Sequence, residues 1–343
     1  MTRQLSFADS INEAMKLAMR QDEDVILLGE DVAGGASVDH LQDDEAWGGV
    51  LGVTKGLVTE FGRNRILDTP IAEAGYMGAA VSAAATGMRP IAELMFNDFI
   101  GSCLDEVMNQ GAKLRYMFGG KAKVPLTVRT THGAGFRAAA QHSQSLYGVF
   151  THIPGIKVVV PSTPADAKGL LMTSIFDDDP VIFSEDKTLY TLKGEVPEGD
   201  YRIPFGQADI KREGEDLTIV AIGKMVHTAL DAAQALEAKG ISVEVVDPRT
   251  LSPLDEETIL QSVMKTERLI VLDEATPRCS AATDIAAMVA DKGFDYLDAP
   301  IKMITSPHTP VPFSPALEDL YLPSKEKVIA VVGEIIGDET MAV

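Results

Sequence analysis

The stretch that most constrains the fold runs from Arg65 to Phe99, RILDTPIAEAGYMGAAVSAAATGMRPIAELMFNDF. Short apolar runs alternate there with a longer helical run, in the order strand, helix, strand and the start of another helix, which is predicted over Asp98–Arg115. Two strands joined through a helix pair in parallel, because the connection must cross back over the sheet. The same alternation continues along the chain. The sequence therefore predicts an α/β fold with parallel sheets and helices on both faces.

The helix in this stretch, predicted over Ala74–Gly87, carries no charge. Six of its fourteen residues are alanine and three are glycine. A helix that only covers a sheet carries a polar stripe that returns every three to four residues, and this helix lacks one. We therefore expect it to be buried, in part against another subunit.

Glu73 lies at the turn before this helix and is the first candidate for chemistry. Beside an apolar wall the charged form of a carboxylate is disfavoured by desolvation, and this tunes a Glu to exchange protons near neutral pH. The alternative is that Glu73 only interacts with the amino end of the helix. Position alone leaves both interpretations open.

The net charge of the chain makes some classes of binding partner improbable. The chain has 30 Lys and Arg against 51 Asp and Glu, a net charge of −21. Such a chain repels phosphate backbones and anionic lipid surfaces, so neither nucleic acid nor a membrane is an expected partner. There is no apolar signal core and no uncharged apolar stretch of spanning length, which favours a cytoplasmic location. Cys103 and Cys279 lack metal-ligand spacing and are expected to be buried.

A change of composition predicts the domain organisation. Hydrophobic periodicity is lost over residues 188–212, where Gly, Pro and charge accumulate, so we expect domains at 1–187 and 213–343 with 188–212 as linker. Strands and helices alternate again in the second part, which predicts a smaller doubly wound domain. It has no Gly-rich phosphate loop and is expected to be scaffold and docking surface. Its predicted strands are Asp216–Gly223, Ser242–Asp247, Arg268–Asp273 and Pro300–Thr305.

One glycine motif resembles a nucleotide site. Gly133, Gly135 and Ala138 follow a predicted strand with the spacing of the dinucleotide-binding pattern. That pattern also needs an acidic residue about 20 positions later, at the end of the next strand. The next strand, Ile156–Val160, is followed by Pro161 and Ser162 instead. A nicotinamide site is therefore disfavoured, and the glycines more simply allow close approach of the backbone to a cofactor or partner.

His142 is the histidine best placed for proton transfer. Its neighbours Gln141, Ser143 and Gln144 are neutral and polar, and such groups hold an imidazole in one tautomer that titrates near pH 7. The alternative is a structural, hydrogen-bonded histidine. His132 is similarly placed and is expected to have fewer polar neighbours.

Three consecutive acids, Asp177 to Asp179, follow the predicted helix Pro164–Phe176. Negative charge at a helix carboxyl end faces the negative end of the dipole and the unpaired carbonyls, so it costs stability unless a cation is present. A bound cation is one expectation, and acids that point into water are the other.

Four segments together identify a family resemblance: Gly29–Val32, Asp68–Tyr76, Ala140–Gln144 and Asp247–Thr250. The chain resembles the β subunit of the thiamine-diphosphate-dependent first component of 2-oxo acid and acetoin dehydrogenase complexes, nearly end to end. The resemblance implies two doubly wound domains, a transketolase-like pyrimidine-binding domain followed by a transketolase C-terminal-like domain. The segment His40–Gly52 is expected to be a surface or interface loop. Its residues, with those of Arg129–Gly148, are similar to the acetoin dehydrogenase branch. That branch cleaves acetoin to acetaldehyde and a two-carbon unit passed to a lipoyl group.

The same resemblance implies roles for individual residues. Glu73 corresponds to the residue that hydrogen-bonds a ring nitrogen of the cofactor's aminopyrimidine and so promotes loss of the thiazolium proton. Met95, Phe99 and Ile71 correspond to residues that line that ring, and His142 to one that acts near the reacting carbon. The family's structural potassium site corresponds to Leu126, Ser174, Ile175, Asp177 and Asp179.

One absence completes the sequence-based hypothesis. The Gly-Asp-Gly motif that carries Mg²⁺ and the diphosphate in these enzymes does not occur in the chain. The resemblance therefore implies an α partner that supplies it, in an assembly of two α and two β chains, and a lipoyl-bearing acyltransferase component. The alternatives are the β subunit of a pyruvate or branched-chain 2-oxo acid dehydrogenase, an NAD-dependent dehydrogenase and a non-catalytic scaffold subunit.

Overall fold

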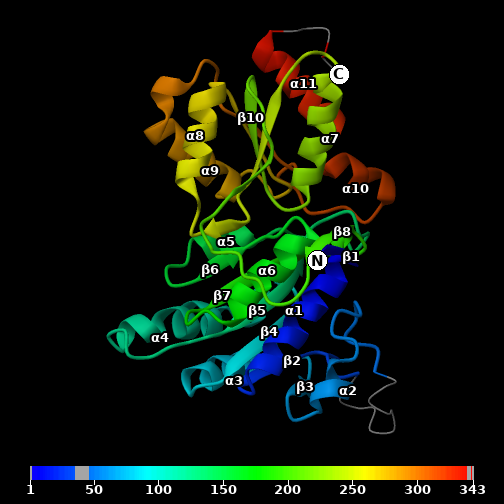
Figure 1. The fold of residues 1–343 in the computed structure, drawn as a ribbon, viewed down its shortest axis with the longest axis vertical. Helices are drawn as coiled ribbons and strands as arrows, with labels where there is room; N and C mark the ends of the chain where they lie inside the picture. The colour runs from blue at the N-terminus through cyan, green and yellow to red at the C-terminus, as the bar shows by residue number, and fades with distance from the viewer. Residues whose placement is uncertain (1, 35–45, 338–340, 342–343) are drawn as a thin grey trace. The chain divides into compact units, whose positions relative to one another are not determined.

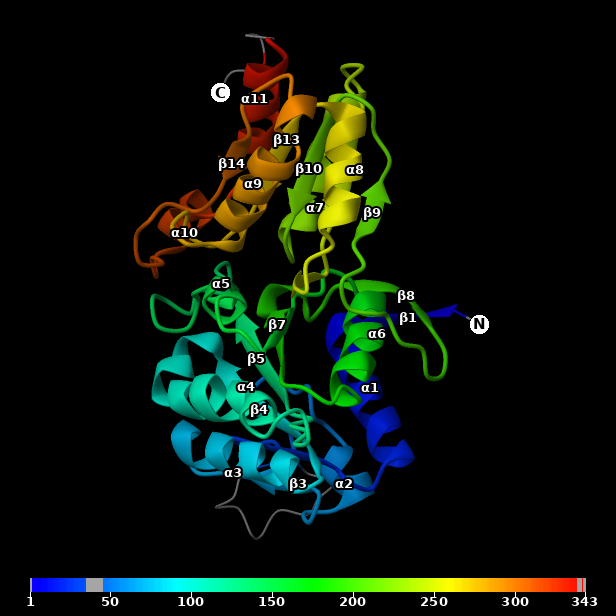
Figure 2. The same cartoon turned by 90° about the vertical axis from the view of Figure 1, so that its left-hand side faces the viewer.

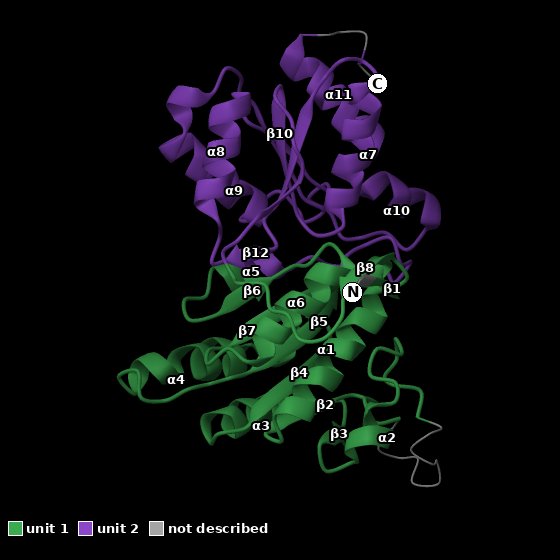
Figure 3. Cartoon of the chain, in the orientation of Figure 1, with its two compact units in different colours: residues 1–132, 150–205 green, residues 133–149, 206–343 purple. Residues whose placement is uncertain are grey.

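The computed structural model describes residues 2–34, 46–337 and 341. The chain divides into two compact units, which are described here one at a time: unit 1 comprises residues 1–132 and 150–205, and unit 2 comprises residues 133–149 and 206–343 (Figure 3). The segment 133–149 therefore belongs with unit 2, although the composition-based boundary assigns it to a first domain of residues 1–187. Within the described residues, no helix is both long and apolar enough to cross a membrane.

Unit 1 is built on a parallel sheet with strand order β6-β7-β5-β4-β2-β3 (Figures 1 and 2). Strands β2, β5 and β7 are buried along their whole length, as expected of a parallel sheet covered on both faces. A separate antiparallel pair joins β1 (Thr2–Ser6) to β8 (Lys193–Pro197). The bounds are β2 Val25–Gly29, β3 Ile66–Asp68, β4 Arg89–Phe96, β5 Thr127–His132, β6 Lys157–Val159 and β7 Val181–Asp186.

Two helices of unit 1, α1 and α6, begin at a capping side chain. Ser6 accepts a hydrogen bond from the amide of Asp9 at the start of α1, and Thr163 does the same for Asp166 at the start of α6. Apolar faces of both helices contribute to one core with the sheet. The bounds are α1 Phe7–Gln21, α2 Leu57–Phe61, α3 Glu73–Ala85, α4 Ala112–Met117 and α6 Pro164–Ile175, and α5 Tyr147–Thr151 crosses the chain boundary between the units.

Helix α3 is buried on one face only. Its buried residues are Tyr76, Met77, Ala80, Val81 and Ala84, while the opposite face is exposed in this single chain and consists of small uncharged residues. The expected burial of the whole helix is therefore not met within the chain. Burial of the second face against another subunit stays a prediction.

The predicted continuous helix Asp98–Arg115 is wrong. The segment forms a 3₁₀ helix over Asn97–Ser102, a break at Cys103, a π-helical turn over Glu106–Gly111 and then α4. Glycines 101 and 111 weaken an α-helix at these points, since glycine loses the most freedom in a helix. The break leaves Phe99 on a tight turn directly after β4.

Unit 2 contains a smaller sheet with order β14-β13-β10-β11-β9, parallel except for β9. The α/β prediction of two doubly wound sheets is confirmed. Strand β9 and the short helix α10 are additional to the predicted elements. The bounds are β9 Asp209–Arg212, β10 Leu217–Ala221, β11 Val243–Asp247, β12 Thr250–Ser252, β13 Leu269–Leu272, β14 Lys302–Ile304, α7 Met225–Glu237, α8 Glu256–Thr266, α9 Ala281–Lys292, α10 Pro315–Tyr321 and α11 Lys325–Ile336.

Two smaller predictions have different outcomes. Cys103 is buried as expected, but Cys279 is exposed, because it lies in the left-handed turn before Ser280, the cap of α9. Of the predicted loop His40–Gly52, residues 40–45 lie outside the described residues, and Trp47 in the remainder is 52% exposed.

A buried ion cluster joins three central strands of unit 1. Arg129 of β5 is 2% exposed, and its Nε and NH2 lie 2.7 and 2.8 Å from the two oxygens of Glu185 on β7. Its NH1 lies 2.8 Å from Oε2 of Glu93 on β4, and Tyr190 donates to Glu185 at 2.6 Å. Burial raises the pKa of Glu93, and Arg129 opposes that rise. The cluster is stable only while the guanidinium is present.

We predict that Arg129→Met destabilises the chain by about 3–5 kcal/mol, since it leaves two buried carboxylates without their cation. The melting temperature should fall by roughly 10 °C, measured by circular dichroism. The matched control is Arg20→Met, which breaks an equally bidentate but exposed pair with Glu60 and should cost less than about 1 kcal/mol. An equal loss of unfolding free energy in the two variants would show that the buried cluster stabilises the chain no more than an exposed ion pair does.

Candidate functional site

The topology of unit 1 selects one edge of its sheet as a binding site. From β2 the chain passes to β3 on one side and then returns to β4 on the other side of β2. Ligands of open α/β sheets bind outside the carboxyl ends of the strands at such a switch point. Glu30 follows β2, Glu73 follows β3, and Asn97 follows β4. Residues far apart in sequence are thus placed at one edge.

This edge is acidic. Burial raises the pKa of Glu30, and the nearby charges of Glu73, Asp31 and Glu93 raise it further. Burial also raises the pKa of the Tyr76 hydroxyl, and the nearby charge of Glu30 is the next largest cause of that rise. A group that binds here therefore meets several carboxylates that repel one another, and among them Glu30 holds its proton at a higher pH than usual.

Several buried polar atoms at this edge have no hydrogen-bond partner in the described part of the chain. They are Glu30 Oε1, Thr69 Oγ1, Tyr76 OH and both polar side-chain atoms of Asn97. Buried polar atoms are nearly always paired, and each unpaired one costs about 1–3 kcal/mol. Their concentration at one switch point is typical of a binding site for a polar group.

Glu73 and its predicted companions lie on β4 or on the segments that directly follow β3 and β4. Glu73 is the first residue of α3 and is half-buried. Met95 of β4 is buried, and its carbonyl accepts a hydrogen bond from Thr131 at 2.7 Å. The Phe99 ring packs edge-on against Phe96, with centroids 5.6 Å apart. Ile71, two residues before Glu73, is 82% exposed, which leaves it available to a ligand or partner.

His132 is more enclosed than the sequence indicates, and the expectation of fewer polar neighbours is wrong. The side chain is 1% exposed and its Nδ1 lies 2.8 Å from Ser184 Oγ. Its carbonyl accepts a hydrogen bond from Lys187 Nζ at 2.9 Å, and Asp186 lies 4.0 Å from Nε2. Pairing of β5 with β7 creates these contacts, and pairing is invisible in local sequence.

His142 lies in unit 2, on the segment 133–149, whereas Glu73 lies in unit 1. It is half-buried in a bend, and its amide lies 3.5 Å from the carbonyl of Ala139. The hydroxyl of the next residue, Ser143, is buried and has no hydrogen-bond partner among the described residues. The structure thus places Glu73, Met95 and Phe99 at one edge of unit 1, and His142 in a separate setting.

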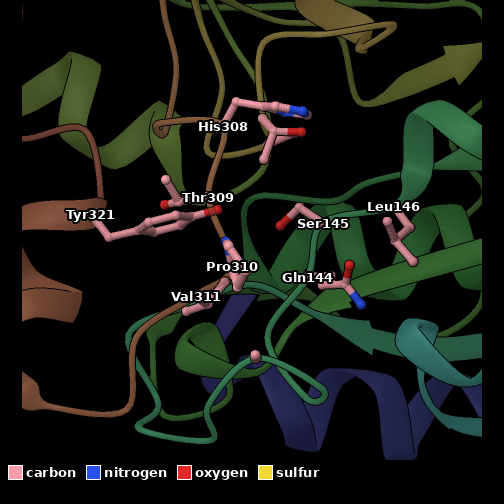
Figure 4. Close-up of a pocket in the computed structure, with 11 residues that line it drawn as sticks. Gln144, Ser145, Leu146, His308, Thr309, Pro310, Val311 and Tyr321 are labelled. Atoms are coloured by element: carbon pink, nitrogen blue, oxygen red, sulfur yellow. The ribbon is translucent and has the colours of Figure 1, made fainter.

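The His142 segment also lines a pocket of unit 2. The pocket holds about 290 Å³ and lies outside the carboxyl ends of β13 and β14. Tyr321 of α10 and Thr309 lie across it from Ser145 and Leu146 (Figure 4). The remaining lining residues are Ala140, Gln144, Ala275, Thr276, His308, Pro310 and Val311. The lining is apolar with a few polar groups and no carboxylate, lysine or arginine, which suits a small uncharged molecule.

The acids after α6 have protein cations as partners, so the expectation that they only point into water is wrong, while the expected bound cation stays a prediction. Lys157 Nζ lies 2.6 Å from Asp177 and 3.2 Å from Asp179. The hydrogen bond from Lys123 lowers the pKa of Asp178. Burial opposes this effect, and the hydrogen bond from Arg89 lowers the pKa further. Further contacts are Arg115 with Asp179 at 2.6 Å, and Arg89 NH1 with the carbonyls of Ile175 and Asp177 at 3.4 and 3.1 Å.

Comparison with known proteins supports the fold and defines the family. The model of the transketolase pyrimidine binding domain matches residues 3–193, and that of the transketolase C-terminal domain matches residues 206–328. A solved structure titled split gene transketolase, inactive beta4 tetramer, has the same fold, with a TM-score of 0.76 at 22% identity over 97% of this chain and 98% of that chain.

The relatives are similar over nearly the whole length. The acetoin:2,6-dichlorophenolindophenol oxidoreductase subunit beta of Bacillus subtilis is 72% identical, over 99% of this chain and 100% of that one. The protein of the same name from Cupriavidus necator is 61% identical over 96% and 97%. The 2-oxoisovalerate dehydrogenase subunit beta of Bacillus subtilis is 43% identical over 96% and 98%. The protein therefore belongs to the transketolase family and, within it, to the β subunits of acetoin and 2-oxo acid dehydrogenases.

Proposed function

We propose that the chain is the β subunit of a thiamine-diphosphate-dependent acetoin dehydrogenase. It takes part in cleavage of acetoin to acetaldehyde and a two-carbon unit that passes to a lipoyl acceptor. The set of unpartnered polar groups at the acidic switch point of unit 1 carries the proposal. Acetoin is favoured over 2-oxo acids because the relatives named for acetoin are 72% and 61% identical, against 43% for 2-oxoisovalerate dehydrogenase.

The residues at the switch point fit the aminopyrimidine end of the cofactor. That ring has both donors and acceptors, which matches Glu30, Glu73, Tyr76 and the amide of Asn97. When bound, thiamine diphosphate supplies a carbon acid that adds to carbonyl compounds. Glu73 holds and gives a proton at the ring nitrogen, while Met95, Phe99 and Ile71 enclose the ring. A carboxyl group beside a ring nitrogen is suited to that transfer, because it can give a proton and take it back.

The same edge does not suit the diphosphate end. Glu30, Asp31, Glu73 and Glu93 interact electrostatically there, and such a field repels phosphates. With no Gly-Asp-Gly motif in the chain, the Mg²⁺ and diphosphate ligands are proposed to come from an α subunit. The exposed, uncharged face of α3 supports an assembly of two α and two β chains.

His142 is proposed to supply and accept protons at the oxygen atoms of the substrate. Imidazole is the side chain whose ordinary pKa suits this task at physiological pH. The two-carbon unit is proposed to leave on the lipoyl group of an acyltransferase component, which restores the site for another cycle.

Substrate choice tests the proposed function. Assembled with its α partner, the chain should support reduction of 2,6-dichlorophenolindophenol by acetoin with kcat/KM at least about tenfold above that for pyruvate, a difference of about 1.4 kcal/mol in transition-state binding. The chain without the α partner is the control and should give no turnover. Faster oxidation of pyruvate would assign the chain to the 2-oxo acid branch.

Glu73→Gln separates a catalytic role from a helix-end role. Glutamine keeps the size and can still form a hydrogen bond, but it does not transfer a proton, so exchange of the thiazolium C2 proton for deuterium should slow by about 10² to 10⁴. Melting of the assembled enzyme should stay unchanged. Glu23→Gln, at the amino-terminal end of β2 where the side chain is exposed, serves as the control. Normal exchange with a lowered melting temperature would contradict the catalytic role.

A potassium ion is proposed at the oxygen atoms of Leu126, Ser174, Ile175, Asp177 and Asp179. A bound ion stabilises the folded state by RT ln(1 + [K⁺]/Kd), about 2.7 kcal/mol at a concentration 100 times Kd. Replacing K⁺ by tetramethylammonium should therefore lower the melting temperature by several degrees. If the melting curve does not move, the ion pairs of Arg89, Arg115, Lys123 and Lys157 alone hold this turn.

A further inference from the structure

At the start of the segment 133–149, which carries His142, every second residue has a left-handed backbone conformation. Gly133, Gly135, Arg137 and Ala139 have φ of 94°, 99°, 61° and 62°. Glycine adopts this left-handed conformation freely, but Arg137 and Ala139 are strained in it. Left-handed residues alternating with ordinary ones turn successive amides inward and form a concavity that binds anions. Strain of this kind persists only where the surroundings hold the backbone in place.

The anion in this concavity is a carboxylate of the chain itself. Glu318 Oε1 lies 2.6 Å from the amide of Gly135 and 3.4 Å from that of Arg137. Its Oε2 lies 2.8 Å from NH1 of the Arg137 side chain. Glu318 belongs to α10 of unit 2, so the segment is bound by the unit to which it belongs.

Glu318 is 0% exposed. Burial of a carboxylate is very costly unless hydrogen bonds and a counter-charge compensate it. The two amides and the guanidinium provide that compensation, and they are correctly spaced only in the observed conformation of residues 133–139. The burial energy of one side chain is therefore linked to a single backbone arrangement before His142.

Unit 2 also fixes the other parts of the segment. The amide of Ala134 lies 3.4 Å from Glu274, whose carboxylate pairs with Lys224 at 2.6 Å. After His142, the Tyr147 hydroxyl donates to Asp273 of the loop that follows β13. His142 is thus held between two anchors, and α10 contributes both Glu318 and Tyr321 of the pocket wall.

We propose that Glu318 is a positioning residue for His142. The glycine motif of the segment allows the backbone conformation that binds the Glu318 carboxylate. The carboxylate takes the place that a phosphate has in a nucleotide site, and it fixes the segment through the amides of Gly135 and Arg137. The proposal rests on the proposed role of His142 in proton transfer. It gives the C-terminal unit a part in the reaction through the placement of that imidazole.

The test compares Glu318→Gln with Asp319→Asn in the assembled enzyme. Glutamine keeps the volume and one acceptor oxygen but turns an NH₂ group toward Arg137. Asp319 is the matched control, because it also bonds Arg137, at 2.6 Å, but is 65% exposed and has no described contact with the amides of the segment. Hydrogen exchange of residues 133–149 and kcat with acetoin are measured, together with His142→Ala and the double variant His142→Ala/Glu318→Gln.

We expect Glu318→Gln to raise amide exchange about tenfold at Gly135 and Arg137 and to lower kcat about 10²-fold, the effect of a misplacement near 1 Å. Asp319→Asn should change both by less than about twofold. In the His142→Ala background Glu318→Gln should cause no further loss of kcat, because residues that act as a unit are not additive. If Glu318→Gln acted only through a general loss of stability, the double variant would show the product of the two single losses of kcat.

The outcomes that overturn the proposal are distinct from those that overturn the proposed function. Multiplied losses in the double variant, or unchanged exchange in Glu318→Gln beside a clear defect in His142→Ala, would overturn the positioning role alone. Full turnover by His142→Ala would overturn the role of His142 and this proposal with it.

Discussion

The parallel direction of the strands in unit 1 is the constraint on which its site depends. Every strand of that sheet ends at the same edge, so each loop that follows a strand contributes to one surface. The reversal of order between β2 and β4 then brings Glu30, Glu73 and Asn97 together. Arg129 supports this arrangement, because it joins β5 to β4 and β7 through Glu93 and Glu185. Pairing of strands, rather than any local motif, creates the site.

The same edge shows why the chain functions as one part of an assembly. Carboxylates that repel each other and buried atoms without partners make the free chain less stable. Such groups are retained where function needs them, and they lose their cost when a ligand or subunit binds. The exposed side chain of Ile71 and the uncharged face of α3 are also unfavourable in the free chain and would be stabilised by contact with a ligand or subunit. Stability of this chain is therefore linked to what it binds.

The sequence predicts the parts of the structure that depend on local periodicity. The alternation of strands and helices and the carboxylate at the start of α3 both follow from residues close together in the chain. The breaks at Cys103 and around Glu106 depend on how that segment packs, and a helical pattern does not show them. The enclosure of His132 and the cations around Asp177 to Asp179 come from other elements of the fold. The family resemblance, more than periodicity, predicts Met95, Phe99 and Ile71 as companions of Glu73.

The glycine motif at Gly133 shows how far a pattern determines chemistry. Glycines at this spacing produce a backbone with inward amides, and that geometry is common to nucleotide sites and to this segment. What differs is the anion. Here it is Glu318, nearly two hundred residues later and on a seven-residue helix, and no property of the sequence around it distinguishes it from the chain's other glutamates. A motif therefore specifies that the backbone binds negative charge, and only the fold decides whether that charge belongs to a ligand or to the protein.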